Sequence, residues 1–201
     1  MAGTKNKVKF NLKNVYYAPL TMTEENSPTW ATPVPIPGAV SLSLDAEGDS
    51  NTFYADGIAY YVSTANNGYS GDLEIAMVPE SFETDVLGQT KDSKQVMIET
   101  TEDQVKPFAL LFQFDGDVKG TRHVLYNCTA TRPSVSSQTN EESKEPVTDT
   151  LSLTASPLSD GRIKAKTTAE TESADYENWF KKVYETPVAE MSTLSKKVGD
   201  K

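Results

Sequence analysis

The stretch that decides the fold is NNGYSGDLEIAMVPESFETDVLG, residues 66–88. It begins with Asn66-Asn67-Gly68, which has the composition of a tight turn because Asn and Gly tolerate positive φ. Leu73, Ile75 and Met77 follow at every second position. The acidic residues Asp72 and Glu74 alternate with the first two. This is the period of a strand that has one face in a core and one face in water. A turn and a strand in such quick succession indicate a framework of antiparallel strands.

The end of the same stretch, PESFETDVLG (79–88), predicts a short structural helix. Pro79 suits a first helical position, and acidic residues in the first turn interact favourably with the positive end of the helix dipole. Phe82 and Val86 are four residues apart and share one face, while Gly88 can end the helix in a left-handed conformation. Four residues are expected to pack or cap this helix: Phe82, Val86, Leu87 and Gly88. The carboxylates of Glu80, Glu83 and Asp85 are expected to stay in water.

Alternation with a period of two extends along most of the chain. Further strands with one face in the core are expected at 8–12, 40–44, 58–62, 124–130 and 151–155. FALLFQF (108–114) is apolar on nearly both faces and predicts a central strand. DGDVKG (115–120) predicts a hairpin turn after that strand. The turn at 66–68 is expected to join a strand at 58–65 to a strand at 71–78.

A second helix is expected near residues 174–184, where Tyr176, Trp179, Phe180 and Val183 form an apolar stripe. Three other stretches are expected to be loops or arms. Residues 21–37 contain four prolines, which exclude a helix or a central strand. Residues 134–147 are polar without a period and predict a long exposed loop. Residues 187–201 predict a polar tail, so one domain is expected over residues 1–186.

Composition limits the class of protein. The chain has 201 residues, 29 acidic and 19 basic, for a formal charge of −10. Tight nucleic-acid binding needs clustered Lys and Arg, so this charge argues against it. The single cysteine cannot form an internal disulfide. Neither an N-terminal apolar run nor a membrane-length apolar stretch is present, so we expect a soluble protein made in the cytoplasm.

The chain is poor in residues for catalysis or metal binding. Nucleophilic catalysis would have to use His123, the only histidine, with Cys128. Their odd separation on one strand is expected to place them on opposite faces. We interpret His123 as a residue near a turn and Cys128 as a small core hydrophobe. Two such residues cannot make a zinc site, and Asp115 with Asp117 lack the rest of a calcium loop. We therefore expect no catalytic, metal or cofactor residue and no enzyme.

Four blocks, taken in order and spacing, resemble the major tail tube proteins of long-tailed, non-contractile bacteriophages, in the group from siphophages of Gram-positive hosts. The resemblance spans about residues 8–186. The blocks are TFYADGIAYY (52–61), NNGYSGDLEIAMVPESFETDVLG (66–88), FALLFQFDGDVKGTRHVLYNCTATRPS (108–134) and ENWFKKVY (177–184).

The resemblance implies a β-sandwich of two roughly orthogonal antiparallel sheets with a flanking short α-helix, extended arms and a long loop. It implies a structural virion protein whose hexameric rings stack into the tail tube, the conduit for DNA ejection. The implied partners are other copies of the chain, tail-tip or baseplate and tail terminator proteins, and a tape measure protein inside the tube. Viral DNA would pass without specific binding, no membrane would be involved, and assembly would take place in the host cytoplasm.

The resemblance also suggests which segments make contacts. PESFETDVLG matches the flanking helix, whose apolar face would close one end of the sandwich. The N-terminal segment, residues 21–37 and the loop at 134–147 fall where family members reach their neighbours. A self-assembly role is expected for eight residues of that loop: Gln138, Thr139, Asn140, Glu141, Glu142, Ser143, Lys144 and Glu145. An added C-terminal immunoglobulin-like domain, which this group can carry, is not expected here.

Two alternative functions stay open at this point. One is a monomeric β-sandwich that binds carbohydrate as an adhesion module through aromatic side chains. The aromatic candidates for it are Tyr16, Tyr17, Phe53, Tyr54, Tyr60, Tyr61 and Tyr69. The other is a hydrolase that uses a pair of carboxylates, although abundant acids make any chosen pair weak support. For the tube, the acidic excess leads to the hypothesis that a negative bore keeps the DNA backbone from sticking.

Overall fold

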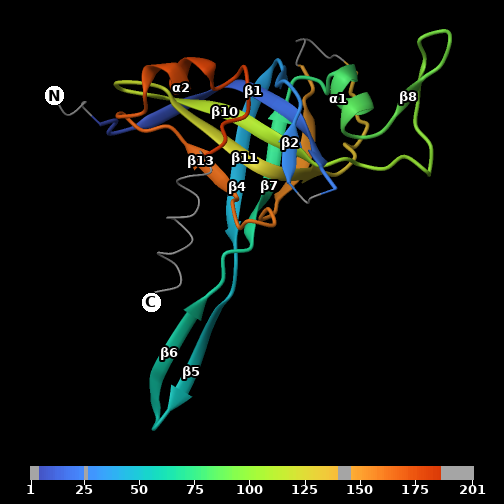
Figure 1. The fold of residues 1–201 in the computed structure, drawn as a ribbon. Coiled ribbons are helices and arrows are strands. Elements are labelled where there is room, and N and C mark those ends of the chain that lie inside the picture. Colours follow the sequence, from blue (N-terminus) through green and yellow to red (C-terminus); the bar gives the residue numbers. More distant parts are fainter. Residues whose placement is uncertain (1–4, 25–26, 140–145, 187–201) are drawn as a thin grey trace.

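The structure, a computed structural model, describes residues 5–24, 27–139 and 146–186. Strands dominate it, and two short helices accompany them (Figure 1). In chain order the elements are β1 (Lys9–Met22), β2 (Pro28–Trp30), β3 (Val34–Pro35), β4 (Ala39–Glu47), β5 (Ser50–Ala55), β6 (Ile58–Thr64), β7 (Gly68–Ile75), α1 (Glu80–Asp85), β8 (Thr90–Lys91), β9 (Met97–Ile98), β10 (Phe108–Gly116), β11 (Thr121–Ala130), β12 (Asp149–Ala155), β13 (Lys164–Lys166) and α2 (Ser173–Asn178).

The body of the protein is one continuous antiparallel sheet. Among the described residues it has nine strands in the order β2-β1-β10-β11-β12-β7-β4, with β13 paired to β11 and β3 paired to β1. Two small hairpins, β5–β6 and β8–β9, lie outside this sheet. The expectation of a mainly β chain with a short flanking helix is confirmed, but the strands form one large sheet instead of two separate ones.

The sheet bends where β11 passes to β12. These strands pair only through Cys128, Thr129 and Ala130 of β11. On one side of this junction lie β1, β10 and β11, and on the other lie β12, β7 and β4, which run across the first group in Figure 1. The two halves of the sheet therefore face each other although hydrogen bonds join them at one corner.

Two hydrophobic cores follow from this bend. The larger core lies between the halves and contains Tyr17 and Phe108 from one half and Leu73, Ile75 and Leu151 from the other. The smaller core includes Ala18, Leu111 and Tyr126 on the opposite face of β1, β10 and β11, where Trp179 and Val183 cover it. FALLFQF lies in the central strand β10, as predicted from its lack of a polar face. Both faces of this strand pack against a hydrophobic core.

The hairpin predicted at Asn66-Asn67-Gly68 is wrong. β6 does not pair with β7; β7 pairs with β4 on one side and β12 on the other, and β6 pairs with β5. The chain turns at Asp56-Gly57, where φ is 52° and 76°, as a two-residue hairpin turn requires. Residues 39–75 thus form one long hairpin. Asn66-Asn67-Gly68 lies in the second half of that hairpin, where β6 is followed by β7.

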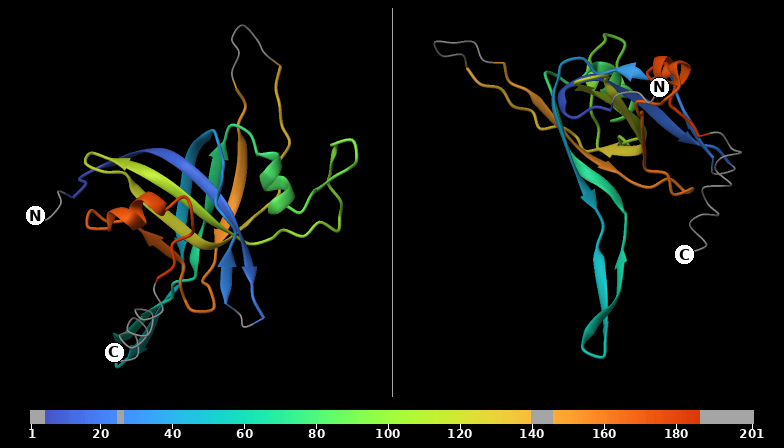
Figure 2. Two further views of the ribbon diagram at one scale, coloured as in Figure 1. Left: turned by 45° about the horizontal axis from the view of Figure 1, so that its top comes forward. Right: turned by 90° about the vertical axis from the view of Figure 1, so that its left-hand side faces the viewer.

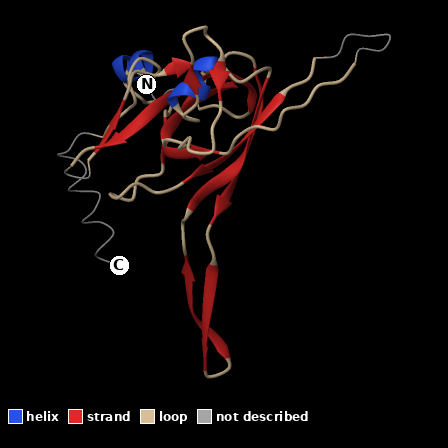
Figure 3. Cartoon of the chain, turned by 90° about the vertical axis from the view of Figure 1, so that its right-hand side faces the viewer, coloured by secondary structure: helices blue, strands red, loops and turns tan. Residues whose placement is uncertain are grey.

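The outer part of this hairpin, residues 50–64, projects far from the body. We call it the arm (Figures 1 and 3). The expectation that Ile58, Tyr60 and Val62 face a core is therefore wrong, since all three are exposed. Figure 3 shows both helices at the end of the body remote from the arm, and Figure 2 shows that no other part of the described chain runs alongside it.

Both helices are shorter than predicted. Pro79 precedes α1 as its N-cap and Val86 follows it as its C-cap. The second helix was expected to run to residue 184, but α2 ends at Asn178, so that Trp179 and Val183 reach the smaller core from the turns that follow. In the described part of the chain, no helix is long and apolar enough to cross a membrane.

The strand expected at 8–12 exists as the start of β1. The prediction that Val8 and Phe10 face the core is wrong. Val8 and Phe10 are about half exposed, because β1 carries irregularities between Phe10 and Leu12 and between Lys13 and Tyr16 that shift its alternation. The proline-rich segment has neither helix nor central strand, as predicted. Its short strands β2 and β3 pair with the outer side of β1, where proline is tolerated.

Candidate functional site

The two residues best suited to catalysis do not form a site. Cys128 is fully buried in the larger core, and burial raises the pKa of its thiol to about 12, so it stays protonated. Its sulfur contacts the carbonyl oxygen of Leu125 at 4.0 Å. The expectation that His123 and Cys128 lie on opposite faces is wrong, because β11 carries an extra residue between Leu125 and Cys128 relative to β10. Cys128 is nevertheless a core hydrophobe, and the described residues contain no cluster of three potential metal ligands.

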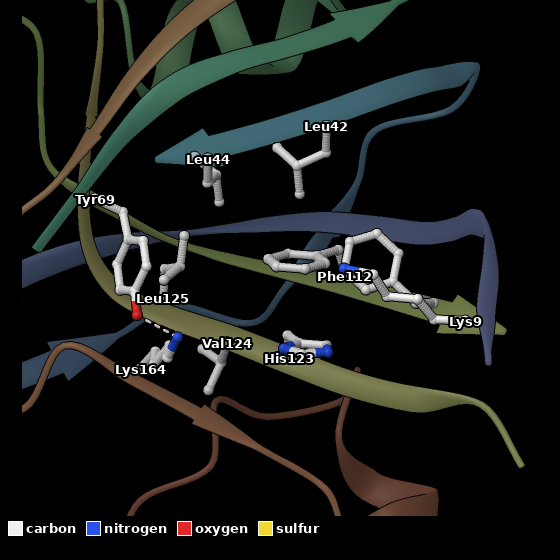
Figure 4. A pocket seen from close by; sticks show the side chains of 10 residues that line it. Lys9, Leu42, Leu44, Tyr69, Phe112, His123, Val124, Leu125 and Lys164 are labelled. Atoms are coloured by element: carbon white, nitrogen blue, oxygen red, sulfur yellow. Dashed lines mark hydrogen bonds between the residues drawn. The ribbon is translucent and has the colours of Figure 1, made fainter. Parts of the chain in front are cut away.

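His123 instead belongs to an aromatic groove between the two halves of the sheet (Figure 4). Its ring stacks on Phe112 with centroids 5.0 Å apart and lies edge-on to Phe114 at 5.3 Å. The cavity has a volume of about 220 Å³. Its lining comes from β1, β4, β7, β10, β11 and β13: Lys9, Leu42, Leu44, Tyr69, Phe112, Phe114, His123, Val124, Leu125 and Lys164. We call it the aromatic groove.

The rim of the aromatic groove is positively charged. Lys9 lies over the ring of Phe114, 5.2 Å from its centroid, and Lys164 lies over Tyr69 and donates a hydrogen bond to its hydroxyl. Burial, followed by repulsion from Lys166, Lys164 and Lys9, lowers the pKa of His123 to about 4. The imidazole is therefore neutral at physiological pH and acts as one more aromatic ring in the groove wall.

The arm is the second candidate surface. Six large hydrophobic side chains on it are between 54% and 69% exposed: Phe53, Tyr54, Ile58, Tyr60, Tyr61 and Val62. Phe53 lies directly opposite Tyr61, and the chain alternates faces, so both faces of the arm carry aromatic or aliphatic groups. A two-stranded hairpin is marginal in water, and among residues 5–24, 27–139 and 146–186 nothing covers these side chains.

The third candidate surface is the outer face of β4, β7 and β12. It carries four carboxylates, of Asp45, Glu47, Asp72 and Glu74. Hydroxyl groups lie between and beside them, from Ser41, Ser43, Ser70, Thr150, Ser152 and Thr154. Lys, Arg and aromatic side chains do not occur at these positions. We call this surface the acidic hydroxyl face.

Hydrogen bonds order the acidic hydroxyl face. The Ser41 hydroxyl donates to Glu74 at 3.0 Å, and Thr148 donates to the other oxygen at 2.7 Å. Thr148 first, and then Ser41, hold the pKa of Glu74 below its ordinary value. Ser152 donates to Asp72 at 2.7 Å. Hydroxyl groups thus favour the ionised form of Glu74. Within the described part of the chain, none of the four carboxylates forms an ion pair that would offset its charge.

The structure places the predicted helix residues in the larger core. Phe82 is fully buried, edge-on to Tyr17 at 5.1 Å and to Phe108 at 5.3 Å. Val86 and Leu87 are also buried, and Gly88 has a φ of 84°. A Cβ on Gly88 would lie 2.8 Å from the carbonyl oxygen of Gln104, so glycine is required there.

The three helix carboxylates differ in their surroundings. Glu80 pairs with Lys91 at 2.6 Å and is exposed to water. Asp85 accepts a hydrogen bond from the Tyr17 hydroxyl at 2.9 Å. Glu83 is partly buried, and burial raises the pKa of its carboxyl, with the negative charge of Glu80 adding to the effect.

The predicted self-assembly loop is only partly described. Gln138 and Thr139 are exposed and belong to no strand, whereas Asn140, Glu141, Glu142, Ser143, Lys144 and Glu145 lie outside the described residues, as does the expected tail at 187–201. Sequence reasoning missed the arm as an exposed hairpin. Its signal was present: Asp56-Gly57 is a strong hairpin turn, and the flanking residues are apolar on both faces.

Comparison with known proteins identifies the family of this chain. A search of curated proteins finds no significant match. A family model described as phage tail tube protein matches residues 4–192, which is nearly the whole chain. Members of such a family are structural and non-enzymatic parts of the virion tail. This chain therefore belongs to the phage tail tube protein family.

Proposed function

We propose that copies of this chain close laterally into hexameric rings, and that the rings stack into a tube whose bore is lined by the acidic hydroxyl face. The two halves of the bent sheet then act as the two crossed walls of a sandwich. The β12-β7-β4 wall faces the DNA path, and the β1-β10-β11 wall, covered by α2, faces outward. Tail-tip, terminator and tape measure proteins are the further partners of the assembled tube.

The observation that carries this proposal is the composition of the acidic hydroxyl face. DNA carries one negative charge per about 1.7 Å of its axis and adheres to surfaces with Lys and Arg. A surface with Asp45, Asp72 and Glu74 and no basic side chain repels it. Ser and Thr hydroxyls keep the same surface hydrated, so a passing duplex meets water and like charge.

Lateral closure is supported by the ends of the sheet. β4 ends the strand order on one side, so its outer backbone groups have no strand partner among the described residues. Such an edge pairs readily with another chain, and head-to-tail contacts that close into a ring leave no free edge. The loop containing Gln138–Glu145 stays a proposed contact between copies.

Cysteine labelling tests the orientation of the face. We expect Ser152→Cys, on the acidic hydroxyl face, to react with a bulky maleimide–polyethylene glycol in free protein but to be protected in intact tails. Glu177→Cys on the exposed side of α2 should react equally in both, and Cys128 adds no background because it is fully buried. Equal labelling of Ser152→Cys in tails and in free protein would contradict a face turned to the bore.

The carbohydrate-binding alternative has little support in the geometry. Tyr17 is fully buried, Tyr16 stacks on Phe180 at 5.0 Å, and Tyr69 forms part of the groove wall. The aromatic groove, at about 220 Å³, is smaller than the roughly 300–1,000 Å³ of typical small-molecule sites. The exposed tyrosines gather on the arm, which offers no concave surface of its own.

A further inference from the structure

We propose that the aromatic groove of one copy receives the arm tip of a second copy, with Phe53 and Ile58 against the groove rings and Asp56 beside Lys9 and Lys164. This inference rests on the proposed function, since it names the surface through which copies in a tube hold one another. It concerns a contact between two regions that the single chain leaves uncovered.

The first support is the exposed apolar surface of the arm. Phe53, Tyr61 and Ile58 lie on one face according to the strand register, and each is more than 60% exposed. Burying such side chains removes apolar area from water, which favours association. The arm points away from the body and cannot reach the groove of its own chain (Figures 1 and 3). Since no described part of its own chain covers the arm, we assign its cover to another molecule.

The second support is charge complementarity. Asp56 is the only charged residue between positions 50 and 64. At the groove, Lys9 and Lys164 interact with aromatic rings, and within the described part of the chain neither ammonium has a carboxylate within ion-pairing distance. One carboxylate at the end of an apolar hairpin matches an apolar groove with two such ammonium groups at its rim.

The third support is shape. The tip is a two-residue turn, and a Cβ added at Gly57 would meet nothing within 4 Å, so the end of the arm is narrow and unobstructed. The groove lining includes Phe112 and Phe114, which offer rings for contact with the arm's apolar face. Phe112 is labelled in Figure 4. Aromatic pairs of this kind stabilise a contact beyond the area that they bury. The volume of the cavity, about 220 Å³, suits a few side chains and not a whole separate ligand.

A second depression, of about 380 Å³, fits the arm less well. It is lined mainly by polar and charged residues, among them Lys5, Asn6, Lys119 and Thr168. Docking there would leave Phe53 and Ile58 against polar groups, and burying those groups without hydrogen-bond partners costs free energy. The aromatic groove is thus the better receptor for the tip.

Disulfide trapping in tails tests the contact. In the phage that encodes the chain, Asp56→Cys combined with Lys164→Cys should give, after mild oxidation, a ladder of covalently joined chains on a non-reducing gel. Asp56→Cys alone, and Asp56→Cys combined with Lys91→Cys on the remote strand β8, should stay monomeric on the gel. Intact tails of the Asp56→Cys/Lys164→Cys variant without a ladder would overturn the docking while leaving the tube itself in place.

A charge exchange decides the matter if the cysteine variant builds no tails. Asp56→Lys should lower the yield of intact tails at least tenfold, and adding Lys9→Glu with Lys164→Glu should restore most of it. Asp49→Lys, a charge change at the base of the arm, should have little effect. Failure of the exchange to restore tails overturns the proposal. The proposed function fails separately if tails of the unaltered phage do not contain this chain.

Discussion

The two halves of the long hairpin between Ala39 and Ile75 have opposite surroundings. In the inner half, β4 and β7 alternate between the two faces apart from one irregularity between Ala39 and Ser41. Leu73 and Ile75 lie in the core, and the carboxylates lie on the outer face. In the outer half, β5 and β6 carry large apolar groups on both faces, and none is buried. The inner half meets its partners within one chain. The outer half is a surface that becomes complete only when copies meet.

The largest expected effect is the unfolding of the body of the protein. Phe82→Asp places a carboxylate at a fully buried site between Tyr17 and Phe108. Loss of the ring alone costs about 3–5 kcal/mol, and the uncompensated charge adds more, against a total stability of about 5–15 kcal/mol. We expect no cooperative thermal transition by circular dichroism. Phe82→Leu, which keeps the site apolar, should fold, and a soluble, cooperatively melting Phe82→Asp protein would refute this placement.

The same change made on the arm should have the opposite outcome. Phe53→Asp combined with Tyr61→Asp adds two charges to an exposed face, so the free energy of unfolding of the isolated protein should change by less than about 0.5 kcal/mol per site. Tails, in contrast, should be absent by electron microscopy. Leu73→Asp in the inner half is the matched variant and should unfold the monomer. Normal tails from the arm variant would show that the arm makes no essential contact.

A smaller effect is expected from the acidic hydroxyl face. Asp72→Lys combined with Glu74→Lys changes the charge of each copy by +4, while leaving both positions outside the core. Tubes should form, but DNA ejection triggered in vitro should slow severalfold, and added salt should relieve the delay because it screens the attraction. Glu172→Lys combined with Glu177→Lys, the same charge change at α2 on the outer wall, is the control. Unchanged ejection kinetics for the Asp72→Lys/Glu74→Lys variant would contradict a bore-facing position.

The smallest expected effect is a pH dependence of stability that arises from His123 in the aromatic groove. The pKa of His123 is lowered to about 4 in the folded protein, from 6.5. The unfolded chain therefore binds more protons, and the contribution of a neutral His123 is complete above pH 6.5 and is lost as the pH falls towards 4. After allowance for the partly exposed ring, we expect about 1–3 kcal/mol. The measurement is the pH dependence of the free energy of unfolding.

His123→Gln is the reference for this measurement, because carboxylates titrate in the same window in both proteins. The difference in free energy of unfolding between the two should shrink as the pH is lowered from 6.5 to 4. A difference that stays constant over this range would mean that folding does not lower the pKa of His123.

Period-two patterns predicted most of the body because they report which side chains avoid water. Leu73 and Leu151 lie where the alternation places them, and FALLFQF, which is apolar on nearly both faces, lies in the central strand. The same pattern at Ile58, Tyr60 and Val62 was misplaced, since alternation does not reveal whether a side chain is covered by its own chain or by another copy. The family resemblance predicted that the chain assembles with other copies. The acidic hydroxyl face could not be predicted in this way, because it depends on β4, β7 and β12 being neighbours in the sheet.

Local irregularities account for the other differences. The extra residue in β11 near Cys128 reverses the face that simple alternation assigns. Two turn signals, at 56–57 and 66–68, compete in the sequence, and only long-range pairing of β7 with β12 decides between them. These outcomes depend on contacts far apart in the chain, which local composition does not encode.

The regular pairing of the arm restricts how its length can change. A strand of six residues such as β5 extends about 20 Å. Lengthening each strand by one residue would turn Phe53 and Tyr61 to the opposite face, whereas two residues per strand would preserve the face and add about 7 Å of reach. If the arm sets the distance between successive layers of a tail, that spacing can be changed only in steps of about two residues.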